Sequence, residues 1–351
     1  MLRDALIFLS DNARARHIAM KAPGARSVAR RFVAGETLDE GLDASRTLVE
    51  NGFFVTLDYL GESVDSREEA RAAADLYVRM LSRIGADAKL REHVNVSLKL
   101  TQMGQDIRLP STGAGAGDSN GTAAGAWPRP TAGAATPEST GGYDDELLLD
   151  NVKRILDTAR DHDIFVRLDM EGTPHTQRTL DFFRALWDSG YRNIGVVLQS
   201  YLRRAGHDVQ QANLLGARVR LCKGAYNEPE EYAFQPKSEV DANYIALMKT
   251  LLSDGTYPGI ATHDPAMIDA TRAYSRARDL PPSGWEFQML YGIRRDLQHQ
   301  LRSAGYNLRV YVPFGEAWYP YLMRRMAERP ANLMFIVGSL WREMRGGRSR
   351  K

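Results

Sequence analysis

Residues 164–199, IFVRLDMEGTPHTQRTLDFFRALWDSGYRNIGVVLQ, hold the pattern that decides the fold. Two short apolar runs, 164–170 and 194–199, flank a stretch with helical periodicity that closes at Gly190. Helices often end at a glycine, and a strand–helix–strand order implies parallel strands joined by a right-handed crossover. The segment therefore predicts one strand, its crossover helix and the next strand of a parallel sheet.

The same alternation recurs along most of the chain. Further apolar runs, each followed by a helical pattern, lie at 53–58, 94–100, 217–222, 259–263, 285–290 and 308–312. Eight such units in about 290 residues are typical of a closed (βα)8 barrel of the TIM type, an α/β fold. A doubly wound open sheet is the competing fold, and it is disfavoured because no GxGxxG motif follows the first run.

We expect three parts along the chain. Residues 1–50 form an N-terminal helical segment, residues 51–345 the barrel with a C-terminal helix near 331–344, and residues 346–351 a basic tail. One stretch differs in composition, because residues 110–142 contain eight glycines and no Ile, Leu or Val. Such a stretch cannot bury enough apolar surface to offset its ordering entropy. It is predicted to be a disordered insertion between the second strand and its helix.

Composition limits the classes of function. The 351 residues carry 46 basic and 44 acidic side chains, a net charge of +2, which disfavours a dedicated nucleic-acid binder. The single cysteine, Cys222, excludes an internal disulfide and favours a reducing compartment. The sequence contains no Cys/His cluster, which disfavours a structural zinc site. No window of about 18 apolar residues occurs, so we expect a cytoplasmic protein that touches a membrane at most peripherally.

Polar residues stand at or near the carboxyl ends of the predicted strands. They are Lys99, Asp169, Gln199, Arg220 and His263. In a barrel these ends form the face that carries active sites. Asp169 and Glu171 alternate on one strand, so only one of them points inward, and we choose Asp169 because it is closer to the apolar run.

The helix predicted after the eighth strand carries a basic pair. Tyr321, Arg324, Arg325 and Glu328 share one helical face, because they are spaced by three, four and seven residues. Two adjacent guanidinium groups are suited to clamp a carboxylate or a phosphate. The alternative is a solvated basic face with no ligand.

Two strand ends carry further candidates. In VRLCKGAY (219–226), Lys223 could form a Schiff base, or with Arg220 it could face an anionic ligand. Gly224 would let the backbone approach a ligand, or it is simply a tight turn. In ATHDP (261–265), a helix N-terminus follows His263 and favours a nucleotide-like cofactor, although a structural histidine is the alternative.

These motifs together resemble one family. The chain is similar to proline dehydrogenase, the flavin-dependent barrel enzyme, in its monofunctional bacterial form, from about residue 50 to 335 outside the insertion. The resemblance rests on eight ordered motifs: DYLGE, SLKLTQMG, VRLDMEG, VVLQSYLRR, VRLCKGAY, ATHD, EFQMLYG, and YVPFG with YLMRRMAERPAN.

The resemblance implies a role for each matching position. Asp169 and Arg220 match catalytic positions. Positions that bind the substrate are matched by Lys99, Arg324, Arg325, Tyr311, Tyr321, Leu290, Tyr226 and Glu62. FAD-contacting positions are matched by Met170, Gln199, Arg220, Lys223, Gly224, Ala225, Thr262 and His263, and we add Glu328.

The implied reaction is the FAD-dependent oxidation of L-proline to Δ1-pyrroline-5-carboxylate, with hydride transfer from C5 to flavin N5 and electrons passed to a quinone. A transient contact with pyrroline-5-carboxylate dehydrogenase is also implied. The tyrosine at position 311 favours proline over 4-hydroxyproline. The alternatives left open are a 4-hydroxyproline-type dehydrogenase, another flavin barrel oxidoreductase, a Schiff-base lyase and a catalytically silent proline-binding sensor.

Overall fold

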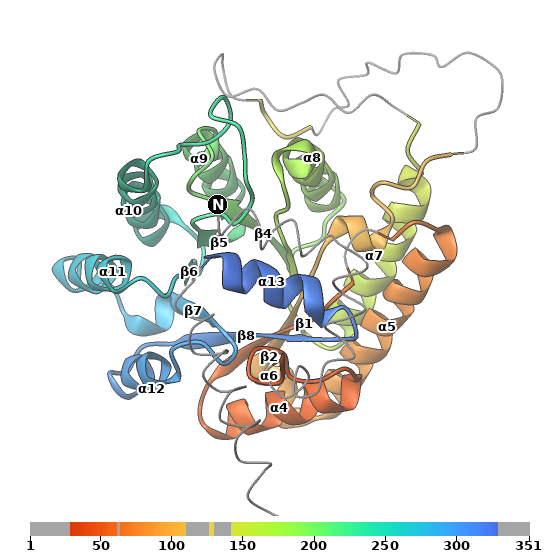
Figure 1. The fold of residues 1–351 in the computed structure, drawn as a ribbon, viewed down its shortest axis with the longest axis horizontal. Helices are drawn as coiled ribbons and strands as arrows, with labels where there is room; N and C mark the ends of the chain where they lie inside the picture. Colours follow the sequence, from red (N-terminus) through yellow and green to blue (C-terminus); the bar gives the residue numbers. More distant parts are fainter. Residues whose placement is uncertain (1–28, 62–63, 110–125, 130–141, 329–351) are drawn as a thin grey trace, which may run out of the picture.

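The computed structural model describes residues 29–61, 64–109, 126–129 and 142–328, and for residues 324–328 it describes the backbone alone. Its centre is a closed barrel of parallel strands in the order β1 to β8, as Figure 1 shows. The strands are β1 (Phe54–Tyr59), β2 (Val94–Leu98), β3 (Val166–Leu168), β4 (Ile194–Gln199), β5 (Arg218–Cys222), β6 (Gly259–Ala261), β7 (Glu286–Leu290) and β8 (Leu308–Phe314). The predicted (βα)8 fold is therefore confirmed, and the third and sixth strands are shorter than predicted.

Helices follow every strand. They are α5 (Arg67–Ala86) and α6 (Ala88–His93) after β1, α7 (Asp145–Asp161) after β2, α8 (Thr173–Asp188) after β3, α9 (Ala205–Leu215) after β4, α10 (Lys237–Asp254) after β5, α11 (Pro265–Ala277) after β6, α12 (Arg295–Ser303) after β7 and α13 (Trp318–Glu328) after β8. Two short 3₁₀ helices, η1 (Leu100–Met103) and η2 (Pro282–Gly284), interrupt the connections.

The barrel separates an apolar shell from a polar lumen. Outward strand residues such as Leu57, Val96 and Leu221 are fully buried in the core cluster. Many inward residues are buried and polar, as in the hydrogen bond from Thr56 on β1 to Asn95 on β2 at 2.6 Å. Alternation along a strand sends successive side chains to opposite faces, which explains why a strand such as β1 carries both kinds.

The ring of outer helices is closed by a segment that precedes the barrel. Helix α4 (Leu38–Glu50) contacts β1 and β8, and Gly41 allows its backbone to approach Phe314 closely. Helix α13, in contrast, lies across the mouth of the barrel in Figure 1. Its apolar side chains Trp318 and Leu322 join Leu60, which follows β1. The last helix that the structure describes therefore covers the face formed by the carboxyl ends of the strands instead of the outer wall.

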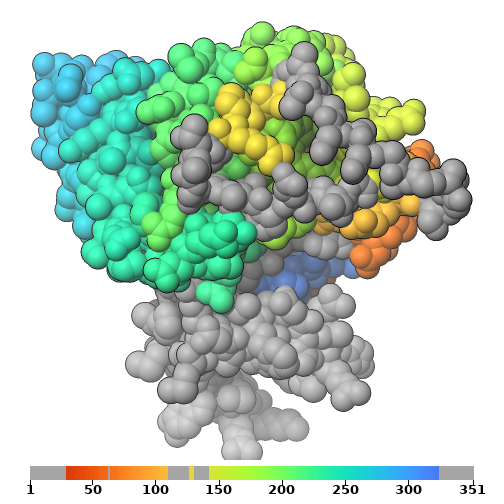
Figure 2. Space-filling model, turned by 90° about the horizontal axis from the view of Figure 1, so that it is seen from above, coloured from red at the N-terminus to blue at the C-terminus, as the bar shows by residue number. Residues whose placement is uncertain are grey.

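The prediction of a wholly disordered insertion is wrong at residues 126–129. Trp127 is only 1% exposed, its Nε1 donates to Asp208 of α9 at 3.0 Å, and its backbone N donates to Asp181 of α8 at 2.8 Å. Figure 2 shows this segment in yellow against the green surface of α8 and α9. One indole ring buries enough area to fix a short polar segment, which an average over the composition hides. Residues 110–125 and 130–141 of the predicted insertion lie outside the described residues.

Other expectations concern parts of the chain that the structure does not describe. These are the predicted helices before residue 29, the helix near 331–344 and the basic tail 346–351. Among the helices that are described, none combines the length and apolar character that crossing a bilayer requires.

Candidate active site

Asp169 is the centre of a polar cluster at the barrel mouth. Its Oδ1 accepts hydrogen bonds from Arg220 Nη1 at 2.7 Å and from Ser97 Oγ at 2.9 Å. Its Oδ2 accepts from the hydroxyl of Tyr311 at 2.7 Å. These residues come from β2, β5 and β8, so the barrel closure brings them together from positions far apart in the sequence. Glu171 points elsewhere and accepts from the hydroxyl of Thr101 at 2.8 Å.

Lys99 lies beside the same cluster. Its Nζ is 3.4 Å from Asp58 Oδ1 and 3.8 Å from Asp169 Oδ2. The ammonium is buried between two carboxylates, so among the described side chains the two cations Lys99 and Arg220 face the two anions Asp58 and Asp169. A buried charge needs such pairing to offset its desolvation.

The hydroxyl of Tyr311 is held in its protonated form. Burial raises the pKa of Tyr311 well above its usual value, and the neighbouring carboxylates of Asp169 and Asp58 raise it further. The ring also lies 5.2 Å from the guanidinium carbon of Arg220. Tyr311 therefore acts as a donor to Asp169 at any ordinary pH.

Arg220 is fixed on several sides. Besides Asp169, its Nε donates to Gln288 Oε1 at 2.5 Å, its Nη1 to Ser97 at 3.1 Å and its Nη2 to Thr56 at 3.4 Å. A guanidinium has five N–H donors. Within the described part of the chain, one donor on Nη2 has no acceptor, so Arg220 retains the capacity to bind one more acceptor.

An apolar wall lies next to the charged cluster. Leu290 at the end of β7 packs against the cluster that contains Tyr321 and Trp318 of α13. The backbone N–H of Leu290 donates to His263 Nε2 at 3.0 Å, so this nitrogen is the unprotonated one in neutral His263. The predicted histidine thus orients the wall residue.

Lys223 is engaged in ion pairs at the rim. Its Nζ lies 2.5 Å from Asp241 and 2.7 Å from Asp264, the N-cap of α11. Burial would raise the pKa of both carboxyls, but the hydrogen bonds and charge of Lys223, together with the charge of Lys237, outweigh burial and lower it. Two ionised carboxylates on one ammonium argue against a nucleophilic amine, which disfavours the Schiff-base alternative.

The turn after β5 contains Gly224. Its φ is +113°, and an added Cβ would lie 2.3 Å from the ring of Tyr201, so the side chain that requires glycine here belongs to the protein itself. Ala225 and Tyr226 are half-buried in the same loop. Two residues later, the carboxylate of Glu228 accepts from the backbone N of Thr173 at 2.8 Å and holds this loop against the start of α8.

The end of β4 presents an acceptor without a donor. Gln199 is 4% exposed, and its Nε2 donates weakly to the carbonyl of Met170 at 3.5 Å. Its Oε1 is buried with no hydrogen-bond partner among the described residues. Such an atom is costly to bury, so it indicates a position where a bound group supplies a donor. Thr262, in contrast, accepts from the backbone N of Asp264 at 3.0 Å.

Several predicted residues are not fully described. Glu62 lies outside the described residues. Arg324, Arg325 and Glu328 are placed by their backbone on α13, the helix over the mouth, and their side chains are not described.

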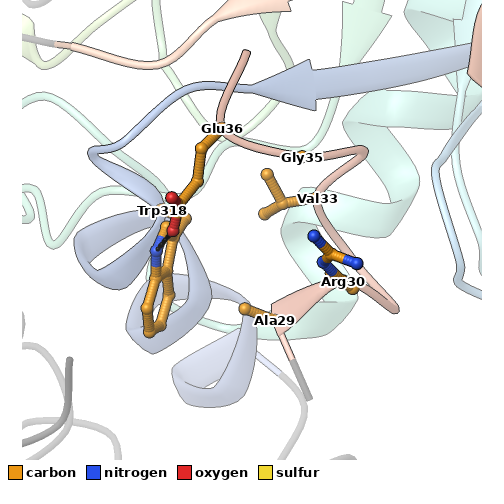
Figure 3. Close-up of a pocket in the computed structure, with 6 residues that line it drawn as sticks. All are labelled: Ala29, Arg30, Val33, Gly35, Glu36 and Trp318. Atoms are coloured by element: carbon orange, nitrogen blue, oxygen red, sulfur yellow. Dashed lines mark hydrogen bonds between the residues drawn. The ribbon is translucent and has the colours of Figure 1, made fainter. Parts of the chain in front are cut away.

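A small cavity lies beside Trp318 of α13. It has a volume of about 60 Å³ and is lined by Ala29, Arg30, Val33, Gly35, Glu36 and Trp318, which Figure 3 shows around it. Trp318 Nε1 donates to Glu36 Oε1 at 3.2 Å across one wall. Ligand sites for small molecules typically enclose about 300 Å³ or more, so this cavity is not the substrate site.

Sequence reasoning missed three residues of the cluster, namely Thr56, Ser97 and Gln288. Each stands two positions before a residue that the sequence places at the mouth. Ser97 precedes Lys99, and Gln288 precedes Leu290. Period-two alternation places such pairs on the same face of a strand. That signal was present in the sequence.

Comparison with known proteins shows the family of this chain. A family model described as proline dehydrogenase matches residues 42–337. Proline dehydrogenase 2 of Bacillus subtilis is 37% identical over 95% of this chain and 96% of its own, and proline dehydrogenase of Deinococcus radiodurans is 36% identical over 89% of both chains.

A solved structure shares the fold. It is proline utilization A from Bdellovibrio bacteriovorus inactivated by N-propargylglycine, with a TM-score of 0.74 and 26% identity. The alignment covers 97% of this chain and 38% of that longer one. A match over most of the chain at this level leaves one assignment: the chain belongs to the proline dehydrogenase family, FAD-using enzymes that oxidise proline to Δ1-pyrroline-5-carboxylate.

Proposed function

We propose that this chain binds FAD and oxidises L-proline by hydride transfer from C5 to the flavin N5, with a quinone as the electron acceptor. The observation that carries the proposal is the cluster of Lys99, Asp169, Arg220 and Tyr311 at the mouth, beside an apolar wall. Cationic groups suit an amino acid carboxylate, and an apolar wall suits a pyrrolidine ring.

The residues present fit a flavin. An isoalloxazine edge carries both N–H donors and carbonyl acceptors, and the mouth offers the unpartnered Gln199 Oε1 and one spare N–H of Arg220. Lys223 and the start of α11 form the rim at which a nucleotide portion would bind. When bound, the flavin would supply the two-electron acceptor that no side chain provides.

Substrate binding would depend on charge and shape. Lys99, Arg324 and Arg325 would hold the carboxylate, with Glu62 paired to the first of the arginines. Leu290, Tyr226, Tyr311 and Tyr321 would enclose the ring. Fixing the substrate in one orientation converts binding energy into rate. The same cations disfavour a further positive charge, so the proline nitrogen would lose its proton more readily.

Electron transfer to a quinone requires an encounter with a membrane. We propose that the protein is cytoplasmic and meets the inner face of the membrane peripherally, where its basic C-terminal end would meet anionic lipid. Transient contact with pyrroline-5-carboxylate dehydrogenase would remove the product. No role in nucleic-acid binding is proposed.

The test is an anaerobic titration of the purified protein with L-proline, followed at the flavin absorbance band. We expect stoichiometric bleaching by L-proline and a smaller response to 4-hydroxyproline. A protein without the band would overturn the flavin assignment. If proline binds to the protein but does not reduce its flavin, the result would point to a sensor. If only a folate substrate reduces the flavin, the result would point to another flavin barrel enzyme.

Selectivity has its own test at Tyr311. Replacing it with alanine removes bulk from the ring wall and should raise the ratio of kcat/KM for 4-hydroxyproline to that for proline by about tenfold. Tyr311→Phe keeps the bulk and should leave this ratio within about twofold. If both variants have the same ratio, Tyr311 does not determine the selectivity between proline and 4-hydroxyproline.

A further inference from the structure

The lumen below the active site contains a chain of buried polar contacts. Arg220 Nε donates to Gln288 Oε1 at 2.5 Å, and Gln288 Nε2 donates to Glu286 Oε1 at 2.6 Å. The same Glu286 oxygen accepts from Arg309 Nε at 2.7 Å. All four residues are at most 8% exposed. A continuous path therefore joins the active-site guanidinium to an ion pair deeper in the barrel.

The chemistry of this chain permits only one orientation of the Gln288 amide. A guanidinium only donates hydrogen bonds, and an ionised carboxylate only accepts them. The amide oxygen must therefore face Arg220 while its nitrogen faces Glu286. Burial alone would raise the pKa of Glu286, but the charge of Arg309 and its hydrogen bond outweigh burial and lower it, so this carboxylate is ionised.

Strand β6 leaves room for this contact. Arg220 on β5 and Gln288 on β7 are separated by β6, whose inward residues are Gly259 and Ala261. An added Cβ at Gly259 would lie 2.3 Å from Gln288 Nε2. The φ of Gly259 is not in the left-handed region, so the backbone does not demand glycine at this position. What demands it is the amide that crosses the lumen.

We propose that Gln288 is a positioning residue for Arg220 in proline oxidation, and that the Glu286–Arg309 pair fixes the orientation of its amide. Gln288 lies on the lumen side of the cluster and bonds to Arg220, so it acts through the guanidinium that faces Asp169. This inference rests on the proposed function, because the expected effects concern a bound flavin next to Arg220.

The first experiment compares Gln288→Met with the wild-type holoenzyme. Methionine keeps the volume and removes both amide groups. We expect kcat to fall about tenfold while KM for proline changes less than about threefold, because the carboxylate is held by other residues. If Arg220 is held less firmly, it stabilises the reduced flavin less. The equilibrium constant for flavin reduction should therefore also fall about tenfold, which lowers the potential by about 30 mV for a two-electron couple.

A double-mutant cycle separates positioning from a structural role. If Gln288 acts through Arg220, the double variant Arg220→Met/Gln288→Met should match Arg220→Met alone within about twofold in kcat and in flavin reduction equilibrium. Effects that multiply would overturn the proposal, and so would an unchanged potential in Gln288→Met. The flavin potential is measured with a chemical reductant, so it does not depend on proline turnover. Proline turnover by the wild type tests the proposed function separately.

Two further variants complete the design. Gly259→Ala retains the amide of Gln288 but crowds it. It should reproduce the fall in kcat and in the flavin reduction equilibrium, and it replaces Gln288→Met as the test if Gln288→Met folds poorly. Gln177→Met is the matched control, because Gln177 is also a buried glutamine that bonds to a carboxylate, Asp181 of α8, outside the lumen. Gln177→Met should retain the wild-type kcat and potential, and an equal loss there would count against the proposal.

Discussion

Asp169 accepts hydrogen bonds from three side chains and faces a lysine at 3.8 Å, so its charge organises the mouth. Asp169→Asn keeps the shape but removes the charge, and its NH₂ group would face a donor. We expect kcat/KM for proline to fall about 100-fold, because a displacement of about 1 Å is enough for such a loss. Steady-state kinetics with L-proline measure the effect.

An exposed aspartate provides the control for this change. Asp188 pairs with Arg184 at 2.9 Å on the surface of α8, and its side chain is 41% exposed. Surface ion pairs contribute little to stability, so Asp188→Asn should leave both the kinetics and the unfolding midpoint unchanged. If Asp169→Asn retains wild-type kcat/KM, the central position given to Asp169 is wrong.

At the scale of elements, Trp127 fastens residues 126–129 to two helices. Replacing a buried tryptophan with alanine costs about 3–5 kcal/mol where the site belongs to the core. The segment can detach without opening the barrel, so we expect local loss instead of global unfolding. In Trp127→Ala, amide hydrogen exchange should quicken in α8 and α9 and stay unchanged in α11. Trp127→Phe should give an intermediate exchange rate. If the wild type and both variants show the same protection in α8 and α9, Trp127 does not anchor the segment.

Gly195 on β4 shows how neighbouring strands constrain one another. An added Cβ would lie 2.4 Å from the backbone oxygen of Arg218 and 2.9 Å from Arg167 Nη1. Because the closest atom is backbone, Gly195→Ala should lower the free energy of unfolding by about 3 kcal/mol in urea titrations. Gly206→Ala on α9 meets nothing within 4 Å and should be neutral or stabilising by up to about 1 kcal/mol. Equal effects in the two variants would contradict the steric account.

At the scale of the whole molecule, buried phenols predict alkaline sensitivity. Burial raises the pKa of Tyr77, Tyr244 and Tyr311 well above 10, and burial with nearby Glu286 raises that of Tyr257 to about 12. The folded state binds these protons more tightly than the unfolded chain. The resulting stability is therefore complete below about pH 10 and is lost as pH rises through the folded values.

Urea unfolding between about pH 8 and pH 12 measures this loss. Tyr257→Phe removes one of the titrating groups, so its unfolding free energy should decline less steeply than that of the wild type between about pH 10 and pH 12. A free energy of unfolding that stays constant across this range would contradict the prediction.

The sequence by itself determined the repeating unit, because the period of the apolar residues changes from two to about 3.6 between strand and helix. It also identified polar residues at strand ends, such as Lys99, Asp169 and Arg220, since their positions follow from where each apolar run stops. These features are local, and each can be judged within one unit.

Only the tertiary structure decided which residues meet. Gln288 reaches Arg220 across β6 because Gly259 leaves space, and Trp127 bonds to Asp181 of α8 and to Asp208 of α9. Helix α4, from before the barrel, takes the place on the outer wall that α13 leaves when it covers the mouth. Such contacts depend on barrel closure and on the shapes of distant side chains, and no local pattern in the sequence records either.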